Sequence, residues 1–395
     1  MSKTYWPLMK DCITDGDKKA MSDFILNAGR FTNGPRVKKF EEEWSEWLGV
    51  KRSLYVSSGS TANFLLLAAI KEHYNLKDGD KVVVPAMTWV TNVGPVIQLG
   101  LQPIFCDVDK RTFSFDKNYL KQLKIVHPDI KAVFVSHLFG VPAEIEEYKE
   151  ILPDAVFIED VCESHGAKCK TGLAGTLSEG STFSFYFGHH ITTVEGGMVS
   201  TNNEDLYQLM RAKRSHGMAR ECDPKVFESF KKQYSDVHPM FMFITDGYNF
   251  RNSEIYAVLG SEQLKRLTDQ NIKREENYKR FREIVSKYPD VIKSDLISEG
   301  TSSFCLQFIC ESQEKKEILE KELSNRGIET RPLCSGNLLR QPFLREKYGV
   351  PDHFPHAEYL HKRGFFIGNN HLITDEDFER FEKDLSDSIN EVYQW

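Results

Sequence analysis

The chain lacks the features that mark membrane, secreted and nucleic-acid-binding proteins. No apolar run approaches the roughly 20 residues that a membrane-spanning helix needs. The first residues, MSKTYWPLMKDC, contain no long apolar stretch and no small-residue cleavage site, so we expect no signal peptide and a cytoplasmic location. Lysine and arginine number 51 against 58 aspartates and glutamates, which gives a formal net charge of −7. A general nucleic-acid-binding protein is normally basic, which argues against that class.

Paired cysteines are also missing. The eight cysteines are scattered, at positions 12, 106, 162, 169, 222, 305, 310 and 334. In a chain of this length such spacing indicates buried or incidental thiols of a reducing compartment rather than a disulfide framework. The sequence contains no CxxC pair and no HExxH motif, so we expect no metal site.

The chain does contain an alternation of short apolar segments and helical patterns. Residues 18–50 indicate two helices separated by a break at Asn33-Gly34-Pro35, and Thr61–His73 indicates another helix. The predicted strands that follow are Ser53–Val56, Lys81–Val84, Gln102–Asp107, Ala132–His137 and Ala155–Asp160. This order predicts βαβ units and a mostly parallel sheet with helices on both faces.

The last third of the chain predicts a second, smaller unit. One long helix around Ser253–Tyr288 would lead to it, and its other predicted elements are strands at Ser302–Glu311 and Gly327–Pro332 and helices at Gln313–Arg326 and Thr374–Tyr393. We therefore predict an α/β protein of two domains. Residues 1–250 would form a large domain with N-terminal helices and a mostly parallel mixed sheet, and residues 251–395 the linking helix and a smaller α+β domain.

Candidate binding residues follow the ends of the predicted strands, where open α/β sheets bind ligands. The segment Ser57–Ala62 follows a strand and opens a helix. Its small side chains let backbone N–H groups approach an anion, and the helix dipole favours negative charge there, although the same residues also suit a tight turn with a helix cap. Ser184, which lies between Phe183 and Phe185, can offer its hydroxyl to a phosphate.

Trp89 and Asp160 also lie after strands. The face of Trp89 can stack on an aromatic ring, but a single tryptophan can equally belong to the core. Asp160 ends the strand VFIED, directly after Glu159. A carboxylate at that point can hold a pyridinium N–H, or it can simply cap a turn.

The most informative segment is Thr182–Gly197, TFSFYFGHHITTVEGG. A strand ends in FSF, a short polar turn carries His189 and His190, and EGG closes the segment. Imidazole exchanges protons near neutral pH, so His189 is a candidate general base. We interpret His190 as a supporting residue beside it.

The order of these features resembles the fold type I aspartate aminotransferase superfamily, and more narrowly its nucleotide-sugar branch of pyridoxal 5′-phosphate (PLP) enzymes. Further similar segments are FTNGPRVKKFEEEW, GYNFRNSEIYAVLGSEQL, IETRPL, SGNLLRQP and HAEYLHKRGFFIGNNH, so the resemblance runs along nearly the whole chain. In the aminotransferases of that branch the position of His189 holds the lysine that forms a Schiff base with PLP. Histidine cannot form that bond, and the HH…EGG turn is similar to the histidine-bearing sugar 3-dehydratases of the branch.

The resemblance implies roles for the matching residues. The phosphate of the cofactor would be held by Gly59, Ser60, Thr61 and Ser184. Trp89 would stack on the cofactor ring, Asp160 would pair with the ring nitrogen, and Glu163 would lie next to its phenolic oxygen.

Two further residues resemble parts of a site shared by two subunits. In this branch the active site lies between the subunits of a homodimer, so Asn249 would reach the phosphate bound by the partner. His216, in RSHGMAR, matches a histidine of the dehydratase site, and a structural loop histidine is its alternative.

The resemblance also implies the reaction. The cofactor, bound non-covalently as PLP or pyridoxamine 5′-phosphate (PMP), would remove the C3 hydroxyl of a nucleotide-linked 4-keto-6-deoxyhexose, with His189 as base. The products would be a 4-keto-3,6-dideoxy sugar and ammonia, and L-glutamate would regenerate PMP. Such sugars, colitose among them, belong to lipopolysaccharide O-antigens. GDP-linked substrates are favoured, although SGNLLRQP is equally close to CDP-linked members. The candidate substrate-binding residues are Arg220, Arg331, Asn337 and Arg340.

Three alternatives remain open. An ordinary sugar aminotransferase would need a lysine such as Lys168, Lys170 or Lys213 at the cofactor. A protein that only binds nucleotide sugars would have kept the fold without catalysis. The CDP-sugar dehydratases that use an iron–sulfur cluster need several grouped cysteines, whereas the corresponding segment, Glu221–Asp246, contains only Cys222.

Overall fold

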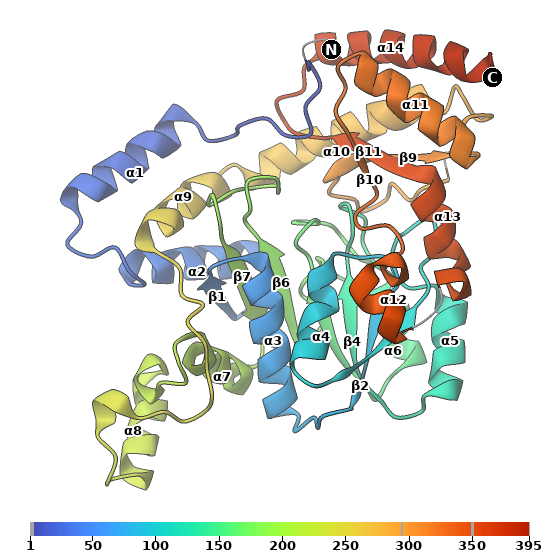
Figure 1. The fold of residues 1–395 in the computed structure, drawn as a ribbon. Coiled ribbons are helices and arrows are strands. Elements are labelled where there is room, and N and C mark those ends of the chain that lie inside the picture. The colour runs from blue at the N-terminus through green and yellow to red at the C-terminus, as the bar shows by residue number, and fades with distance from the viewer. Residues whose placement is uncertain (1–3, 294, 349–350, 395) are drawn as a thin grey trace.

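The computed structural model describes residues 4–293, 295–348 and 351–394. Its larger part is built around a seven-stranded sheet and its smaller part around a four-stranded sheet (Figure 1). The strands of the larger sheet are β1 (Arg52–Val56), β2 (Lys81–Pro85), β3 (Gln102–Cys106), β4 (Ile130–Ser136), β5 (Val156–Asp160), β6 (Gly180–Ser184) and β7 (Gly197–Thr201). Their spatial order is β1-β7-β6-β5-β4-β2-β3.

This sheet is parallel from β3 to β6, and β7 pairs antiparallel with both β6 and β1. Its central strands are almost entirely buried, as the continuous apolar runs of β2 and β4 require for a sheet covered on both faces. The helices that connect its strands are α3 (Gly59–His73), α4 (Gly94–Gln98), α5 (Lys117–Val126) and α6 (Ile145–Ile151), and α7 (Glu204–Arg214) follows its last strand. The predicted mostly parallel mixed sheet with flanking helices is therefore confirmed.

The smaller sheet is antiparallel. Its strands are β8 (Ile292–Lys293), β9 (Cys305–Cys310), β10 (Thr330–Pro332) and β11 (Gly364–Gly368), in the order β10-β11-β9-β8. The helices of this part are α11 (Gln313–Asn325), α12 (Pro342–Tyr348), α13 (Pro355–Arg363) and α14 (Asp375–Tyr393). The start of the chain also belongs here, because the buried Trp6 donates a hydrogen bond from Nε1 to the carbonyl of Gly368 at 2.9 Å.

The helical segments before and after the larger sheet pack against each other. The predicted helix–turn–helix at the start is confirmed as α1 (Asp15–Asn27) and α2 (Pro35–Leu48), and both pack on α9 (Glu254–Leu264). The single long helix predicted around Ser253–Tyr288 is wrong, because a second helix, α10 (Leu267–Val285), begins after a break at Lys265-Arg266. The Arg266 guanidinium is bound at this break by the buried Asp17 carboxylate at 2.8 Å. The segment contains no proline there, so the break depends on long-range contacts such as this one.

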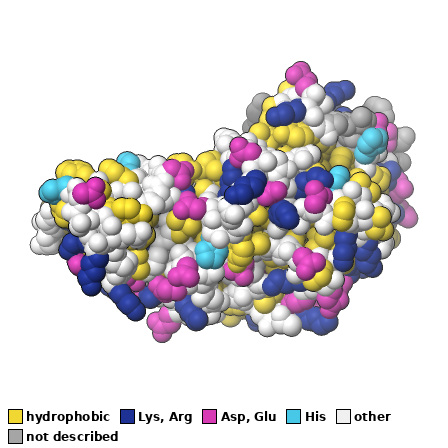
Figure 2. Space-filling model, turned by 90° about the horizontal axis from the view of Figure 1, so that it is seen from below, with side chains coloured by type: hydrophobic (Ala, Val, Ile, Leu, Met, Phe, Trp, Pro, Cys, Tyr) yellow, Lys and Arg dark blue, Asp and Glu magenta, His cyan; other side chains and the backbone are white. Residues whose placement is uncertain are grey.

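Helix α8 (Pro224–Gln233) and the chain that follows it extend away from the sheet (Figure 1). This excursion exposes the large apolar side chains of Met240, Phe241 and Phe243. Seen from below, Lys and Arg side chains are interspersed with Asp and Glu, and this face has no broad patch of one charge sign (Figure 2). Within the described part of the chain, no helix combines the length and the apolar character needed to cross a membrane.

Candidate active site

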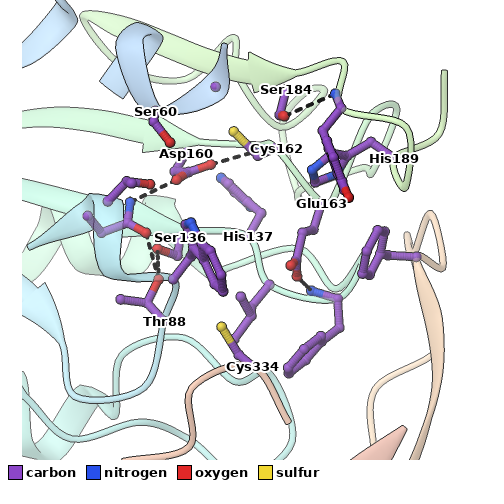
Figure 3. A pocket seen from close by; sticks show the side chains of 18 of the residues that line it. Ser60, Thr88, Ser136, His137, Asp160, Cys162, Glu163, Ser184, His189 and Cys334 are labelled. Atoms are coloured by element: carbon purple, nitrogen blue, oxygen red, sulfur yellow. Dashed lines mark hydrogen bonds between the residues drawn. The ribbon is translucent and has the colours of Figure 1, made fainter. Parts of the chain in front are cut away.

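A cavity of about 520 Å³ lies where the carboxyl ends of β4, β5 and β6 meet the smaller domain (Figure 3). Several residues selected from the sequence line it together. They are Gly59, Ser60, Trp89, Asp160, Glu163, Ser184 and His189 from the larger domain and Arg331 from the smaller one. Trp89 is 54% exposed, so it forms part of the cavity mouth and does not belong to the core.

Asp160, at the end of β5, is fixed by neutral donors. Its Oδ2 accepts hydrogen bonds from the side-chain amides of Asn63 at 2.8 Å and Asn92 at 2.9 Å. Its Oδ1 accepts one from the backbone N–H of Cys162 at 2.9 Å. These donors hold the carboxylate in place without a cation that would neutralise it. Asp160 can therefore offer a negative charge to a cationic N–H that enters the cavity.

Gly59 and Ser184 form a narrow cradle at the N-terminus of α3. A Cβ atom on Gly59 would lie 2.6 Å from the Cβ of Ser184, so only glycine fits there. The helix begins with a capping box, in which the Ser58 side chain accepts from the Thr61 backbone at 3.1 Å and the Thr61 hydroxyl accepts from the Ser58 backbone at 2.9 Å. Ser60 faces the cavity, whereas the Thr61 hydroxyl serves the cap. A helix N-terminus beside hydroxyl groups favours an anion such as a phosphate.

His189 lies on the opposite wall, in the turn after β6. Its backbone N–H donates to the Tyr186 carbonyl at 3.0 Å, and its ring packs on the ring of Phe304 with a centroid distance of 5.4 Å. The ring atom Nδ1 has no hydrogen-bond partner among the described residues. Burial, with a smaller contribution from the Arg274 cation, lowers the pKa of His189 to about 4. The imidazole is therefore neutral at physiological pH.

Glu163 lies in the same cavity. Its Oε2 accepts a hydrogen bond from the Phe139 backbone N–H at 2.9 Å. Burial raises the pKa of Glu163 to about 7, and the negative charge of Asp160 adds to the effect. Phe139 adopts the left-handed backbone conformation, with φ of 60°, and this geometry directs its N–H to the carboxylate.

Other residues of the cavity were not identified from the sequence. They are His137, Ser136, Thr88, Asn92, Cys162, Tyr186, Phe304 and Cys334. His137 forms a fully buried ion pair with Glu159 at 3.0 Å, and Glu159 also accepts hydrogen bonds from the backbone of Gly175 and Leu177. This network anchors the end of β5 just before Asp160. The sequence held a usable signal for Ser136 and His137, which end a predicted strand, and for Asn63, which bonds to Asp160 and lies one helical turn after Gly59 on the same face of α3.

Some candidate residues lie outside this cavity. His216 and Asn249 are neighbours on an exposed stretch, where the His216 backbone N–H donates to the Tyr248 carbonyl at 2.7 Å. The Asn249 side chain accepts a hydrogen bond from Arg251 at 3.1 Å. Arg220 is exposed just before α8 and donates to the Met240 carbonyl at 3.0 Å.

Asn337 and Arg340 likewise do not line the cavity and are engaged with the same carboxylate. Asn337 is completely buried, and its side chain donates to Glu358 at 3.2 Å. Arg340 donates from Nε to Glu358 at 2.8 Å. These two contacts fix the loop that follows β10.

No lysine is among the described residues that line the cavity. Lys168 and Lys170 are exposed, and the buried Lys213 forms ion pairs with Asp246 at 2.6 Å and Glu72 at 2.7 Å. Cys222 is buried against the carbonyl of Gln208. The cavity therefore offers an imidazole, and no amine, at the turn after β6.

The fold and this cavity together define the class of protein to which the chain belongs. Two sheets of this topology, with a carboxylate at the end of β5 and an anion cradle at the start of α3, form an aminotransferase-like fold. The sequence matches the model of the DegT/DnrJ/EryC1/StrS aminotransferase family over residues 12–385, and the chain belongs to that family. The resemblance expected from the sequence is thereby confirmed.

Known proteins of this family are similar to the chain over most of its length. The GDP-4-keto-6-deoxy-D-mannose 3-dehydratase of Yersinia pseudotuberculosis is 35% identical over 379 residues, which cover 93% of this chain and 92% of that protein. The E. coli enzyme of that name, solved with bound hydrated PLP, has a TM-score of 0.88 and 32% identity over 97% of this chain and 100% of that one. A further structure of this dehydratase, with a trapped PLP-glutamate geminal diamine, has a TM-score of 0.84 and 32% identity over 95% and 99% of the two chains.

Proposed function

We propose that the protein is a PLP/PMP-dependent 3-dehydratase of a nucleotide-linked 4-keto-6-deoxyhexose, with a GDP-linked sugar favoured. The observation that carries this proposal is the neutral imidazole of His189 in a cavity whose described lining contains no lysine. The similar proteins named GDP-4-keto-6-deoxy-D-mannose 3-dehydratase support the substrate. The exposed or ion-paired state of Lys168, Lys170 and Lys213 disfavours an ordinary aminotransferase.

The residues of the cavity fit a phosphorylated pyridine cofactor. The cradle of Gly59, Ser60 and Ser184 would hold its phosphate, and Trp89 at the mouth would stack on its ring. Asp160 would pair with the ring nitrogen. When bound as PMP, the cofactor would supply an amine for the sugar ketone and a ring that accepts an electron pair.

His189 and Glu163 would handle protons beside that cofactor. No described residue bonds to Nδ1 of His189, and the neutral ring can accept a proton and pass it to the departing C3 hydroxyl. Glu163, whose pKa is about 7, can act as either a donor or an acceptor near the phenolic oxygen. Phe139 and Phe304 would help exclude water from this wall.

The proposal includes a homodimer with a shared site. Asn249 and His216 lie outside the cavity of their own chain but are exposed, and the segment after α8 exposes Met240, Phe241 and Phe243. Burying these side chains against a second copy would remove a large apolar area from water. Sedimentation should therefore show a dimer, and a fully active monomer would contradict this part of the proposal.

The test is a substrate panel. The purified protein would be incubated with L-glutamate and the GDP-, CDP- or dTDP-linked 4-keto-6-deoxyhexose, and ammonia, 2-oxoglutarate and the sugar product would be measured. We expect one ammonia and one 2-oxoglutarate for each 4-keto-3,6-dideoxy sugar, fastest with the GDP sugar. The glutamate-bound state of a similar dehydratase supports this donor. Transamination without ammonia release would point to an aminotransferase instead.

The product class places the enzyme in dideoxysugar biosynthesis. A similar protein of Salmonella typhimurium carries the name lipopolysaccharide biosynthesis protein RfbH, which supports a role in surface polysaccharide. Colitose as the final sugar and a cytoplasmic location stay predictions from the sequence.

A further inference from the structure

A buried layer of basic groups lies behind the cavity wall that carries His189. The ring of His165 is stacked on that of His189 with a centroid distance of 6.3 Å and lies 5.0 Å from that of His190. His165 is fully buried, and neither of its ring nitrogens has a hydrogen-bond partner among the described residues. His190 bonds through Nε2 to the Ser302 carbonyl at 2.9 Å.

Arg274, on α10, adds a permanent charge to this layer. Arg274 is only 4% exposed, and no carboxylate in the described part of the chain forms an ion pair with it. Its Nε has no hydrogen-bond partner there either. Burial lowers its pKa only to about 10, so the guanidinium stays charged at neutral pH. An unpaired buried cation is costly, which suggests a function for it.

Arg274 is connected to His189 through Phe304. The guanidinium donates to the backbone carbonyls of Phe304, at 3.4 Å, and Asn369. The Phe304 ring in turn packs on the ring of His189 and lines the cavity. The cation is thus fixed to the backbone of the residue that covers the imidazole, and its field reaches His189 through protein rather than through water.

We propose that Arg274 is a positioning residue whose charge adds to the effect of burial in disfavouring a proton on His189. A proton on His189 would place a second positive charge near a fixed cation that has no counter-ion. The same repulsion would help the ring to release the proton to the departing hydroxyl. The inference rests on the proposed function in one respect, because it takes His189 as the group that moves the proton.

The other ionisable groups around His189 do not replace this effect. On the cavity side, Asp160 and Glu163 lie on the same lining, and ionised carboxylates there would favour a protonated imidazole. Tyr186 packs edge-on against His189, with a ring-centroid distance of 6.2 Å. Behind the wall, His165 and His190 are themselves neutral, because burial and Arg274 lower the pKa of both rings. Arg274 is the permanent cation of the layer.

The experiment is an NMR titration of the His189 ring in protein with isotopically labelled histidine, assigned by the signal that His189→Asn removes. It needs neither cofactor nor substrate, so its outcome is separate from that of the sugar assay. In Arg274→Met we expect the pKa of His189 to rise by about half a unit or more. Arg274→Lys, which keeps the charge, should keep most of the depression. An unchanged titration in Arg274→Met, or an equal rise in Arg274→Lys, would overturn the proposal.

A second pair of variants tests the same charge without removing Arg274. Burial raises the pKa of the Cys12 thiol and the Arg274 cation partly opposes that rise, and the thiol bonds only weakly, to Gln263 at 3.8 Å. A carboxylate in Cys12→Asp would partly neutralise the guanidinium and should raise the pKa of His189, whereas the uncharged Cys12→Asn should leave it near the parent value. Equal titrations in these two variants would count against a role for the Arg274 charge.

Discussion

The central polar groups on the two walls of the cavity, Asp160 and His189, differ in their hydrogen bonding. On one wall, the Asp160 carboxylate accepts hydrogen bonds from Asn63, Asn92 and the backbone of Cys162. On the other wall, Nδ1 of His189 has no partner among the described residues, and the ring packs on Phe304. A carboxylate held by several donors keeps one orientation. An imidazole with an unbonded ring nitrogen can take up a proton at that nitrogen, so the comparison separates a fixed hydrogen-bond acceptor from a proton carrier.

The largest expected effect comes from His189. His189→Asn should lower dehydration by about 10²–10⁴-fold, since an amide has no useful basicity near neutral pH. PMP binding should change little, because the cradle and Asp160 remain, and both quantities can be measured by product assay and cofactor titration. A rate within a few-fold of the parent would show that another group is the base.

The companion variant is His189→Lys, which places an amine at the position where the aminotransferases of this branch have their lysine. It should capture PLP covalently, so that the cofactor stays with the chain on denaturation after borohydride treatment, whereas the parent releases it. Dehydration should fall, and weak transamination of the sugar ketone is the expected gain. Release of all the cofactor by the treated variant would contradict the placement of His189.

The second largest loss of activity is expected at Asp160, on the wall opposite His189. Asp160→Asn should fold normally and lose activity on the order of 100-fold, because the cofactor ring nitrogen loses its charged partner. Thermal unfolding would verify the fold, and the ring absorbance of the bound cofactor would report its protonation. Near-parental turnover would mean that Asp160 only closes a turn.

The contrast between the walls also shows what the sequence could and could not predict. The ends of apolar strands revealed Asp160, Ser184 and His189, because each lies at a transition from a strand to a polar turn. Asn92 and Phe304 could not be found in this way, since their contribution depends on contacts between elements far apart in the chain. Arg274 lies in a charged helical stretch, NIKREENYKRF, whose local pattern indicates a solvated face, yet the side chain is buried.

The same limit explains the break between α9 and α10 and the location of Asn337. Residues 265 and 266 show no local signal of a helix end, and the break is fixed by Asp17, which lies 249 residues before Arg266 in the chain. Asn337 belongs to a polar loop by sequence, but its amide is buried against Glu358. Polar residues of a loop and of a buried network have the same local signature, and only tertiary packing distinguishes them.

A smaller effect is expected from the donors that fix Asp160. Asn92→Ala removes one of the two amides on Oδ2, and the loss of a buried hydrogen bond to a charged group costs about 1–3 kcal/mol, so we expect activity to fall roughly tenfold. The matched control is Asn203→Ala, which removes the cap of α7 away from the cavity. That control should lower the thermal stability but keep the activity at room temperature. Equal activity losses in both variants would mean that the Asn92 amide acts only through stability.

The smallest expected effect is a change in the pH dependence of thermal stability when Glu163 is replaced. Its pKa in the folded protein is raised from 4.5 to about 7, so its contribution to stability is complete at low pH and is lost as the pH rises through about 7. Glu163→Gln should remove this loss, and the change in Tm between pH 5 and pH 8 should differ from the parent by about a few degrees. Glu299→Gln, at an exposed glutamate, serves as the control. The same pH dependence in Glu163→Gln and the parent would contradict the raised pKa.

The most direct test of the central claim is the mass of the sugar that the parent protein makes from GDP-4-keto-6-deoxy-D-mannose and L-glutamate. A neutral His189 in a cavity without a lysine predicts a product that has lost one oxygen atom and keeps its ketone, formed together with ammonia. A product that carries an amino nitrogen in place of the ketone oxygen, with no ammonia released, would contradict the account.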